Sequence, residues 1–321
     1  MFKYTLKRLV QLIPTLFIVV LIVFIITRVI PGDPAAVMLG PQASVEDVEN
    51  LREKLGLNES IWSQLGDYLK GLLKGDLGDS YYYNEPVSDI IAERFPATFV
   101  LSISSMIISL LVGIPIGVIS ATKQYSKFDY ITMILALIGI SMPVFWLALM
   151  LVLIFSVNLG WLPSVGMGSE GFVDIIKHLI LPSISLAVIS AGVFARFTRS
   201  SMLDIIKEDY IKTANAKGLK QKVVVWKHAF KNALPPIITI VGIQFSSLLS
   251  GAILTETIFS WPGMGKLIVD AIEKRDYSLV QGGVIFVAFV YVIINLAVDL
   301  SYALLNPKVR AGFEGTSEGR K

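Results

Sequence analysis

Six apolar segments, each long enough to cross a lipid bilayer as a helix, constrain this chain more than any other feature. A helix rises 1.5 Å per residue, so about 20 apolar residues cross roughly 30 Å of hydrocarbon. Of the 321 residues, 54% are hydrophobic and only 17% are charged, which excludes an ordinary soluble domain of this length. The sequence therefore predicts an all-α polytopic membrane protein with six transmembrane helices near 9–30, 97–121, 130–157, 179–199, 234–256 and 281–305.

The distribution of Lys and Arg predicts how these helices are oriented, because positively charged connectors stay in the cytoplasm. Nine Lys or Arg lie from Arg196 to Lys231, whereas the first connector, 31–96, holds twelve Asp or Glu against five Lys or Arg. Both termini are therefore expected to be cytoplasmic and 31–96 to lie outside. The apolar core of the first segment runs about 20 residues, longer than that of a signal peptide, so we interpret it as a retained span.

The chain is expected to divide into parts that follow this topology. The first connector contains VEDVENLREKLGLNESIWSQLGDYLKGLLKG, whose pattern predicts two short amphipathic helices separated at Gly56, a small extracytoplasmic helical cap. The predicted parts are an N-terminal transmembrane helix at 1–30, an extracytoplasmic loop domain at 31–96, a transmembrane core at 97–305 with a cytoplasmic loop at 200–233, and a cytoplasmic tail at 306–321.

Several classes of chemistry lack the residues they need. There is no cysteine, so disulfides, thiolate catalysis and cysteine-based metal sites are excluded. The two histidines, His178 and His228, are predicted on opposite sides of the membrane, which leaves no histidine pair for a metal. No phosphate-binding G-x-x-x-x-G-K-[ST] motif occurs, so any ATP must be bound by another chain. We expect no catalytic residue, no metal, no cofactor and no nucleic-acid partner, although membrane lipid surrounds the chain.

Ionisable residues are nearly absent from the centres of the predicted spans. Arg28, Arg196 and Glu256 fall near span ends and are interpreted as anchors or packing partners. Asp299 lies about two turns inside the last span, so we predict that it is an intramembrane packing charge with a partner. A gradient-driven transporter or channel, an alternative function, would require buried titratable groups or an inverted repeat, and neither is evident. Prolines at 115, 143 and 182 are expected to kink helices.

The basic connector between the fourth and fifth spans carries Lys212, Lys217, Lys220, Lys222, Lys227 and Lys231. Its sequence RFTRSSMLDIIKEDYIKTANAKG predicts a helix leaving the membrane and then a short amphipathic helix that ends at Gly218. LKQKVVVWKHAFKNALPP predicts a second short helix that stops before Pro235. The apolar residues Ile211, Ala214 and Ala216 could fill a groove in a partner, or the lysines could bind anionic headgroups. The residues alone favour neither reading.

This connector resembles the EAA loop of ABC importer permeases, a coupling helix docked on an ATPase subunit. Lys212, Thr213 and Ala214 occupy the Glu-Ala-Ala positions before Gly218, so the glutamate and first alanine are replaced. Leu-Pro also follows about four residues farther along than in the general pattern. TANAKG and HAFKNALPP are instead similar to the dipeptide/oligopeptide/nickel branch, as are RLVQLIPTLFIVVLIVFIITRVIPGDP, GDLGDSYYYNEPVSDIIAERFPATFVLS, TETIFSWPGMGKLIVDAIEKRDYSLVQG and NLAVDLSYALLNPKVR.

The resemblance implies a type I permease fold in a bacterial or archaeal cytoplasmic (inner) membrane, of the kind encoded first of two permeases. It implies a second, non-identical permease, two cytoplasmic ATPases that bind ATP and Mg²⁺, and an extracytoplasmic binding protein. The implied cargo is peptides, with nickel or metal chelates as the alternative. A membrane scaffold that only recruits a soluble enzyme is a third class of reading. The residues expected to dock on the ATPase are Lys212, Thr213, Ala214, Ala216, Gly218 and Leu219.

A last candidate site lies between the final two spans, in WPGMGKLIVDAIEKRDY. The turn at Pro262 and Gly263 predicts a re-entrant or surface helix after it. We expect Trp261, Pro262 and Gly263 to form an outer gate or to meet the binding protein. Trp261 could equally be an aromatic anchor at the level of the headgroups.

Overall fold

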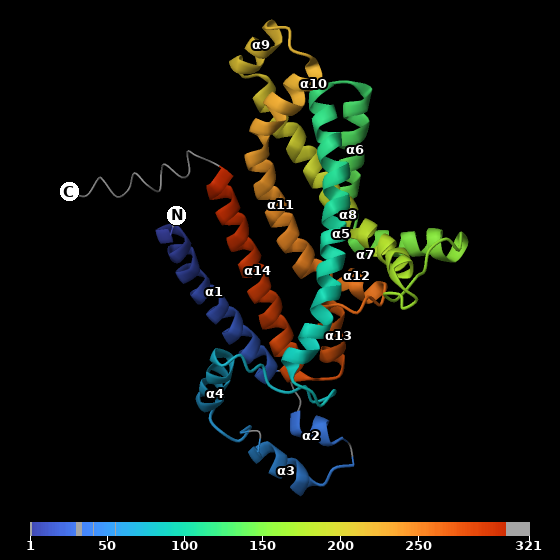
Figure 1. The fold of residues 1–321 in the computed structure, drawn as a ribbon. Helices are drawn as coiled ribbons and strands as arrows, with labels where there is room; N and C mark the ends of the chain where they lie inside the picture. Colours follow the sequence, from blue (N-terminus) through green and yellow to red (C-terminus); the bar gives the residue numbers. More distant parts are fainter. Residues whose placement is uncertain (1, 30–33, 41, 55, 306–321) are drawn as a thin grey trace, which may run out of the picture. The chain divides into compact units, whose positions relative to one another are not determined.

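The computed structural model describes residues 2–29, 34–40, 42–54 and 56–305, and over these the regular secondary structure is helical, with an isolated β-bridge between Asp79 and Pro86. The predicted all-α class is thereby confirmed. The helices, shown in Figure 1, are α1 Phe2–Val29, α2 Pro34–Leu39, α3 Val45–Lys54, α4 Ile61–Leu73, α5 Val87–Thr122, α6 Lys127–Ser141, α7 Val144–Leu151, α8 Phe172–Ile206, α9 Asp209–Ala216, α10 Gln221–Val223, α11 Lys231–Gly251, α12 Ile253–Ile258, α13 Met264–Glu273 and α14 Tyr277–Leu305, with π-helical turns η1 Val152–Asn158 and η2 Val224–Phe230.

Five helical stretches of the described chain are long and apolar enough to cross a membrane. A sixth span arises if the pair Lys127–Ser141 and Val144–Asn158 is counted as one, although the two halves are bent by 102°. The bend falls at Pro143, which caps α7 in an extended conformation and cannot supply the N–H that would continue α6. The five stretches are Val10–Arg28, Val87–Thr122, Phe172–Ile206, Gln221–Leu249 and Tyr277–Val298.

The fifth predicted span begins differently from the expectation. The prediction that a short helix stops before Pro235 is wrong: η2 runs directly into α11, which contains Pro235 and Pro236 within one candidate span, Gln221–Leu249. Proline removes a backbone hydrogen bond, but membrane helices tolerate it where neighbouring helices and local π-type adjustments satisfy the freed groups. The π-helical turn η2 lies directly before the two prolines.

The chain divides into two compact units. Unit 1 contains Phe99–Trp261 and the part of α14 from Tyr291, and unit 2 contains Val10–Thr98 and Pro262–Val290. In unit 1, α8 packs against α6 and α11. Several glycines of this unit lie at close helix–helix contacts, because small residues let membrane helices approach one another.

Helices α5 and α8 of unit 1 pack closely at two glycines. A Cβ added to Gly113 would lie 2.6 Å from the Ala191 carbonyl oxygen, and one added to Gly117 would lie 2.6 Å from that of Ala195. These glycines are four residues apart and so lie on one face of α5, opposite the equally spaced alanines of α8. Close backbone packing therefore holds these two helices together.

Unit 2 contains the predicted cap helices. α3 and α4 are separated at Gly56, which has a φ of 64°, as the amphipathic pattern predicts. Ser60 caps α4 by accepting a hydrogen bond from the Ser63 backbone. The units do not test the predicted division at residues 30, 96 and 305, which stays a prediction, and the predicted tail at 306–321 lies outside the described residues.

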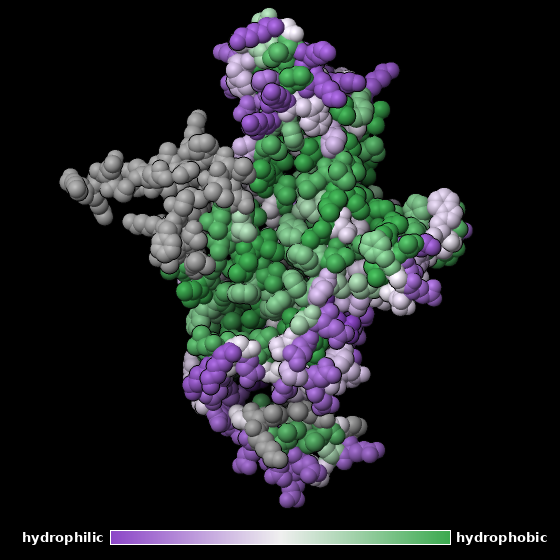
Figure 2. All heavy atoms as spheres, in the orientation of Figure 1, coloured by the Kyte–Doolittle hydropathy of each residue, from purple (hydrophilic) through white to green (hydrophobic). Residues whose placement is uncertain are grey.

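Hydrophobic side chains cover the exposed surface of the spans in unit 1. Figure 2 shows this surface in green over α5 and α6, and the tip formed by α9 and α10 in purple. On α6 the exposed residues are apolar on several sides, as expected for a helix that faces lipid tails. They include Ile131, Ile134, Leu135, Leu137 and Ile138.

Candidate functional site

The connector after α8 folds into the helix–glycine–helix segment that its sequence predicts. α9 ends at Ala216, Lys217 caps it, and Gly218 takes a φ of 72°, with its N–H donating to the Asn215 carbonyl over 2.9 Å. A left-handed residue after a helix is the usual role of a C-terminal glycine. The Gln221 amide donates to the Asn215 side chain over 3.0 Å and braces the bend.

The inner face of α9 packs against other helices of its own chain. Ile211 is 1% exposed and Ala214 is 8% exposed, and both pack in a core cluster with Met202 of α8. The sequence analysis expected Ala214 to dock on the ATPase and left open whether Ile211 fills a groove in a partner. Their burial instead places them in the interior, because an amphipathic helix next to apolar helices of its own chain packs there first. The rest of this cluster is Val118, Ala121, Val224, Ala229, Ala233 and Ile237.

The outer face of α9 is what remains for a partner. The Lys212 ammonium pairs with Asp209 over 2.8 Å on the surface, and the Thr213 hydroxyl donates to the Asp209 carbonyl over 2.9 Å. Nothing lies within 4 Å of the position where a Cβ on Gly218 would be. We call the exposed residues Tyr210, Lys212, Thr213, Ala216, Lys217, Gly218 and Leu219 the outer face of α9.

A partly buried ion pair lies in the same unit and was not predicted. Arg199 of α8 donates through Nε and Nη2 to the two carboxylate oxygens of Asp129 over 2.6 and 2.7 Å. The Asp129 carboxylate also accepts the Tyr125 backbone N–H over 3.0 Å. Asp129 is 2% exposed, and this two-pronged geometry is the strong form of an arginine–carboxylate contact. It ties the start of α6 to α8.

The structure also bears on the candidate residues near the ends of the last two predicted spans. Trp261 is fully buried, which excludes its interpretation as a headgroup-level anchor, and Gly263 caps α13. Glu256 is also fully buried rather than an end anchor. Asp299 lies in α14, but its side chain is outside the described residues. Whether Trp261, Pro262 and Gly263 form an outer gate stays a prediction.

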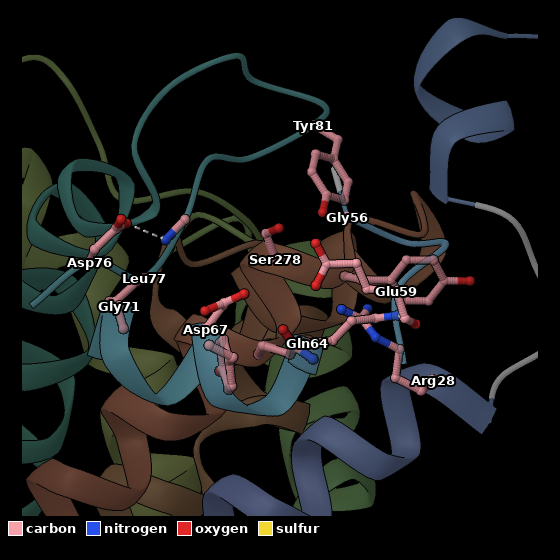
Figure 3. A pocket seen from close by; sticks show the side chains of 14 residues that line it. Arg28, Gly56, Glu59, Gln64, Asp67, Gly71, Asp76, Leu77, Tyr81 and Ser278 are labelled. Carbon is pink, nitrogen blue, oxygen red and sulfur yellow. Dashed lines mark hydrogen bonds between the residues drawn. The ribbon is translucent and has the colours of Figure 1, made fainter. Parts of the chain in front are cut away.

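Unit 2 contains a polar pocket of about 260 Å³ that was not predicted. Figure 3 shows the Arg28 side chain at one end of it and Asp76 at the other, with Asp67 and Gln64 between them. The lining comes from the end of α1, from α4 and the segments around it, and from the start of α14. The residues are Arg28, Gly56, Glu59, Gln64, Asp67, Tyr68, Gly71, Asp76, Leu77, Gly78, Tyr81, Tyr277, Ser278 and Gln281.

Tyr68 of the pocket keeps its proton over the whole physiological range. Burial raises the pKa of the Tyr68 phenol well above its ordinary value, and the nearby Arg28 guanidinium opposes this only in part. Burial disfavours the charged form of any acid. The hydroxyl of Tyr68 is therefore available in the pocket as a hydrogen-bond donor.

Candidate membrane spans joined by a basic connector are typical of a membrane transport subunit. Residues 113–311 match the family described as "Binding-protein-dependent transport system inner membrane component", and residues 1–102 match its N-terminal domain. The chain belongs to this family. It is a multi-pass inner-membrane permease subunit of an ABC transport system, it is not itself catalytic, and ATP is bound by partner ATPases.

Individual relatives resemble the chain over nearly its whole length. It is 47% identical to the dipeptide transport system permease protein DppB of Alkalihalophilus pseudofirmus, covering 97% of this chain and 100% of that protein. It is 43% identical to the glutathione transport system permease protein GsiC of Escherichia coli K12, covering 97% of this chain and 99% of that protein. The predicted resemblance is thereby confirmed.

The fold also resembles a solved structure. The methionine ABC transporter MetNI in inward-facing conformations superimposes with a TM-score of 0.55 at 17% identity, covering 68% of this chain and 96% of that chain. At this identity the likeness shows the fold alone. It confirms the predicted permease-like architecture.

Proposed function

We propose that this chain forms half of the translocation pathway of an importer for di- or oligopeptides. The observation that carries this is the 47% identity to a dipeptide permease over the full length of both chains. The second relative is named for glutathione, which is itself a short peptide. Both names favour peptides over nickel or metal chelates as the cargo.

The other half of the pathway would be a second, non-identical permease. Two cytoplasmic ATPases and an extracytoplasmic binding protein would complete the complex. The basic connector and the acidic 31–96 segment support an orientation with both termini in the cytoplasm and the cap outside. In this orientation α9 faces the ATPases.

The outer face of α9 is the surface we propose for contact with an ATPase. Its inner face is anchored by Ile211 and Ala214 in the core cluster of unit 1, so a force applied to α9 is passed to α8 and α5. The exposed Leu219, at 40%, offers an apolar side chain next to the bend. ATP binding would draw this rigid segment toward its counterpart in the second permease and tilt the helices attached to it.

The test is a substitution at Gly218, where the space around the Cβ position is open and only the backbone conformation is restrictive. Asparagine accepts a positive φ, so Gly218→Asn preserves the helix end and Gly218→Asp adds a charge at the same size. We expect Gly218→Asp to leave the complex assembled and to reduce peptide-stimulated ATPase activity by about tenfold. Stimulation is measured in reconstituted vesicles with a binding protein and dialanine.

The matched control is Gly218→Asn, which should retain most of the stimulation. Equal loss in both variants, with the complex intact, would contradict a charge-sensitive contact. Loss of assembly in Gly218→Asp alone would reduce Gly218 to a helix cap. Stimulation by a nickel chelate in place of dialanine would overturn the peptide assignment.

A further inference from the structure

The pocket of unit 2 is lined by several buried polar atoms to which the described residues supply no hydrogen bond. Among the described residues, four such buried atoms line it: Nε of Arg28, Oε1 of Gln64 and the hydroxyls of Tyr68 and Tyr277. Tyr277 is 5% exposed, so its hydroxyl is removed from bulk water. A buried polar group without a partner costs free energy, and a concentration of them at one cavity indicates a ligand.

Two of the three carboxylates that line the pocket lie away from its arginine. In Figure 3 the Arg28 guanidinium lies at one end, with the Glu59 side chain near it, and the carboxylates of Asp67 and Asp76 lie toward the other end. The Glu59 carboxylate already accepts a hydrogen bond from the Ser63 hydroxyl over 2.5 Å. One oxygen of Asp76 accepts the Gly78 backbone N–H over 2.8 Å, and one of Asp67 accepts from the Lys70 ammonium over 2.8 Å. Each carboxylate thus has a second oxygen that none of these bonds uses.

A metal ion does not fit this arrangement. No group of three or more His, Asp or Glu in the described part of the chain is placed to hold one. A ligand that carries its two opposite charges at separate ends does fit. Its carboxylate would meet Arg28 and the Tyr68 hydroxyl, and its ammonium would meet Asp67 and Asp76.

We propose that this pocket binds a small zwitterionic solute, a short peptide held by its free carboxylate and free ammonium. The proposal rests on the proposed peptide function and adds a binding site in the permease itself. The pocket volume of about 260 Å³ suits a dipeptide with small side chains. Charge-assisted contacts at both ends would select peptides with unblocked termini.

The experiment titrates the assembled complex of permeases and ATPases in nanodiscs, without binding protein, by saturation-transfer NMR. Three probes are used: dialanine, N-acetyl-dialanine and dialanine amide. We expect dialanine to bind about tenfold more tightly than either blocked form, because each has lost one charged contact. Arg28→Gln should abolish the preference for dialanine over its amide while keeping the preference over the acetylated form. Asp67→Asn should weaken the second preference.

Tyr277→Phe removes only the unpaired hydroxyl and should weaken dialanine binding about fivefold. The matched control is Tyr82→Phe, in the same unit, because Tyr82 is exposed and does not line the pocket. Equal binding of all three probes, no binding, or identical titrations for Tyr277→Phe and Tyr82→Phe would mean that the pocket holds water only, and would overturn the proposal.

Failure of this proposal is separable from failure of the proposed function. Stimulation of ATPase activity by dialanine with its binding protein supports peptide import whatever the pocket binds. If dialanine fails to stimulate the wild-type complex, peptide import is overturned even where the pocket titrates. A peptide-stimulated complex whose pocket variants bind like wild type overturns the pocket alone.

Discussion

Two charged side chains near the ends of candidate spans differ in how far the chain itself satisfies their hydrogen bonds. They are Asp129 in unit 1 and Arg28 in unit 2. The Asp129 carboxylate receives three hydrogen bonds, two from Arg199 and one from the Tyr125 backbone. The Arg28 Nε–H donates no hydrogen bond to any described residue, and it lines a pocket with three further polar atoms that have no partner there. Charges satisfied within the chain hold helices together, whereas charges left incomplete prepare a site for another molecule.

The largest expected effect comes from breaking the satisfied pair. Asp129→Ala leaves Arg199 without its partner at a site where the carboxylate was 2% exposed. We expect a loss of about 3 kcal/mol in the free energy of unfolding, because the remaining charge is no longer compensated. The measurement is thermal unfolding of the purified complex, together with the yield of assembled complex.

Arg199→Lys is the control, because it keeps the charge and loses the two-pronged geometry. Its stability should fall between that of wild type and that of Asp129→Ala. A melting temperature of Asp129→Ala equal to that of wild type would show that the pair behaves like an exposed surface ion pair and would remove the contrast with Arg28.

The next prediction compares a glycine-to-alanine substitution in unit 1 with one in unit 2. Gly113→Ala places a methyl group 2.6 Å from the Ala191 carbonyl oxygen and 2.8 Å from the Phe194 Cβ, so α5 and α8 must separate. We expect a cost of about 2 kcal/mol from overpacking. Gly66→Ala in α4 meets nothing within 4 Å and should stabilise that helix by up to about 1 kcal/mol.

Hydrogen exchange, followed separately in α5 and α4, measures both changes. The expected result is faster exchange in α5 of Gly113→Ala and slower exchange in α4 of Gly66→Ala. Changes of the same sign in the two helices would contradict the assignment of close packing to Gly113.

The smallest effect concerns pH. Because burial raises the pKa of the Tyr68 phenol in the folded state, folded and unfolded chains are both protonated here at neutral pH. As the pH rises above the ordinary tyrosine value of about 10, only the unfolded state loses the proton, and stability falls. Thermal unfolding at pH 8 and pH 10.5 should show a smaller decrease in Tyr68→Phe than in wild type. An equal decrease in both proteins would place the phenol in contact with bulk water.

The features that the sequence predicts correctly depend on residues close together in the chain. The lengths of the apolar segments predict the membrane spans, and glycines predict the break at Gly56 and the end of α9 at Gly218, because glycine readily takes the left-handed conformation found there. Pro143 interrupts a predicted span as expected. Pro235 does not, because the membrane setting and the π-helical turn before it let the helix continue.

Contacts between distant residues account for what the sequence could not predict. Asp129 and Arg199 are 70 residues apart, and the pocket joins residues from Arg28 to Gln281. The amphipathic pattern of α9 identified an apolar face, but a pattern on one helix does not say whether its own chain or a partner covers that face. For this reason the sequence could not show that Ile211 and Ala214 pack inside their own chain.

The length of α8 has a mechanical consequence. From Pro182 to Ile206 it runs as uninterrupted helix into the segment that carries α9, and at 1.5 Å per residue this stretch measures about 36 Å. A rigid rod of this length turns a tilt of about 5° into a displacement of about 3 Å at its far end. The Arg199 pair holds α8 to α6, and the contacts at Ala191 and Ala195 hold it to α5. α8 thus acts as a lever, and the positions of these contacts determine how far its end moves for a given tilt.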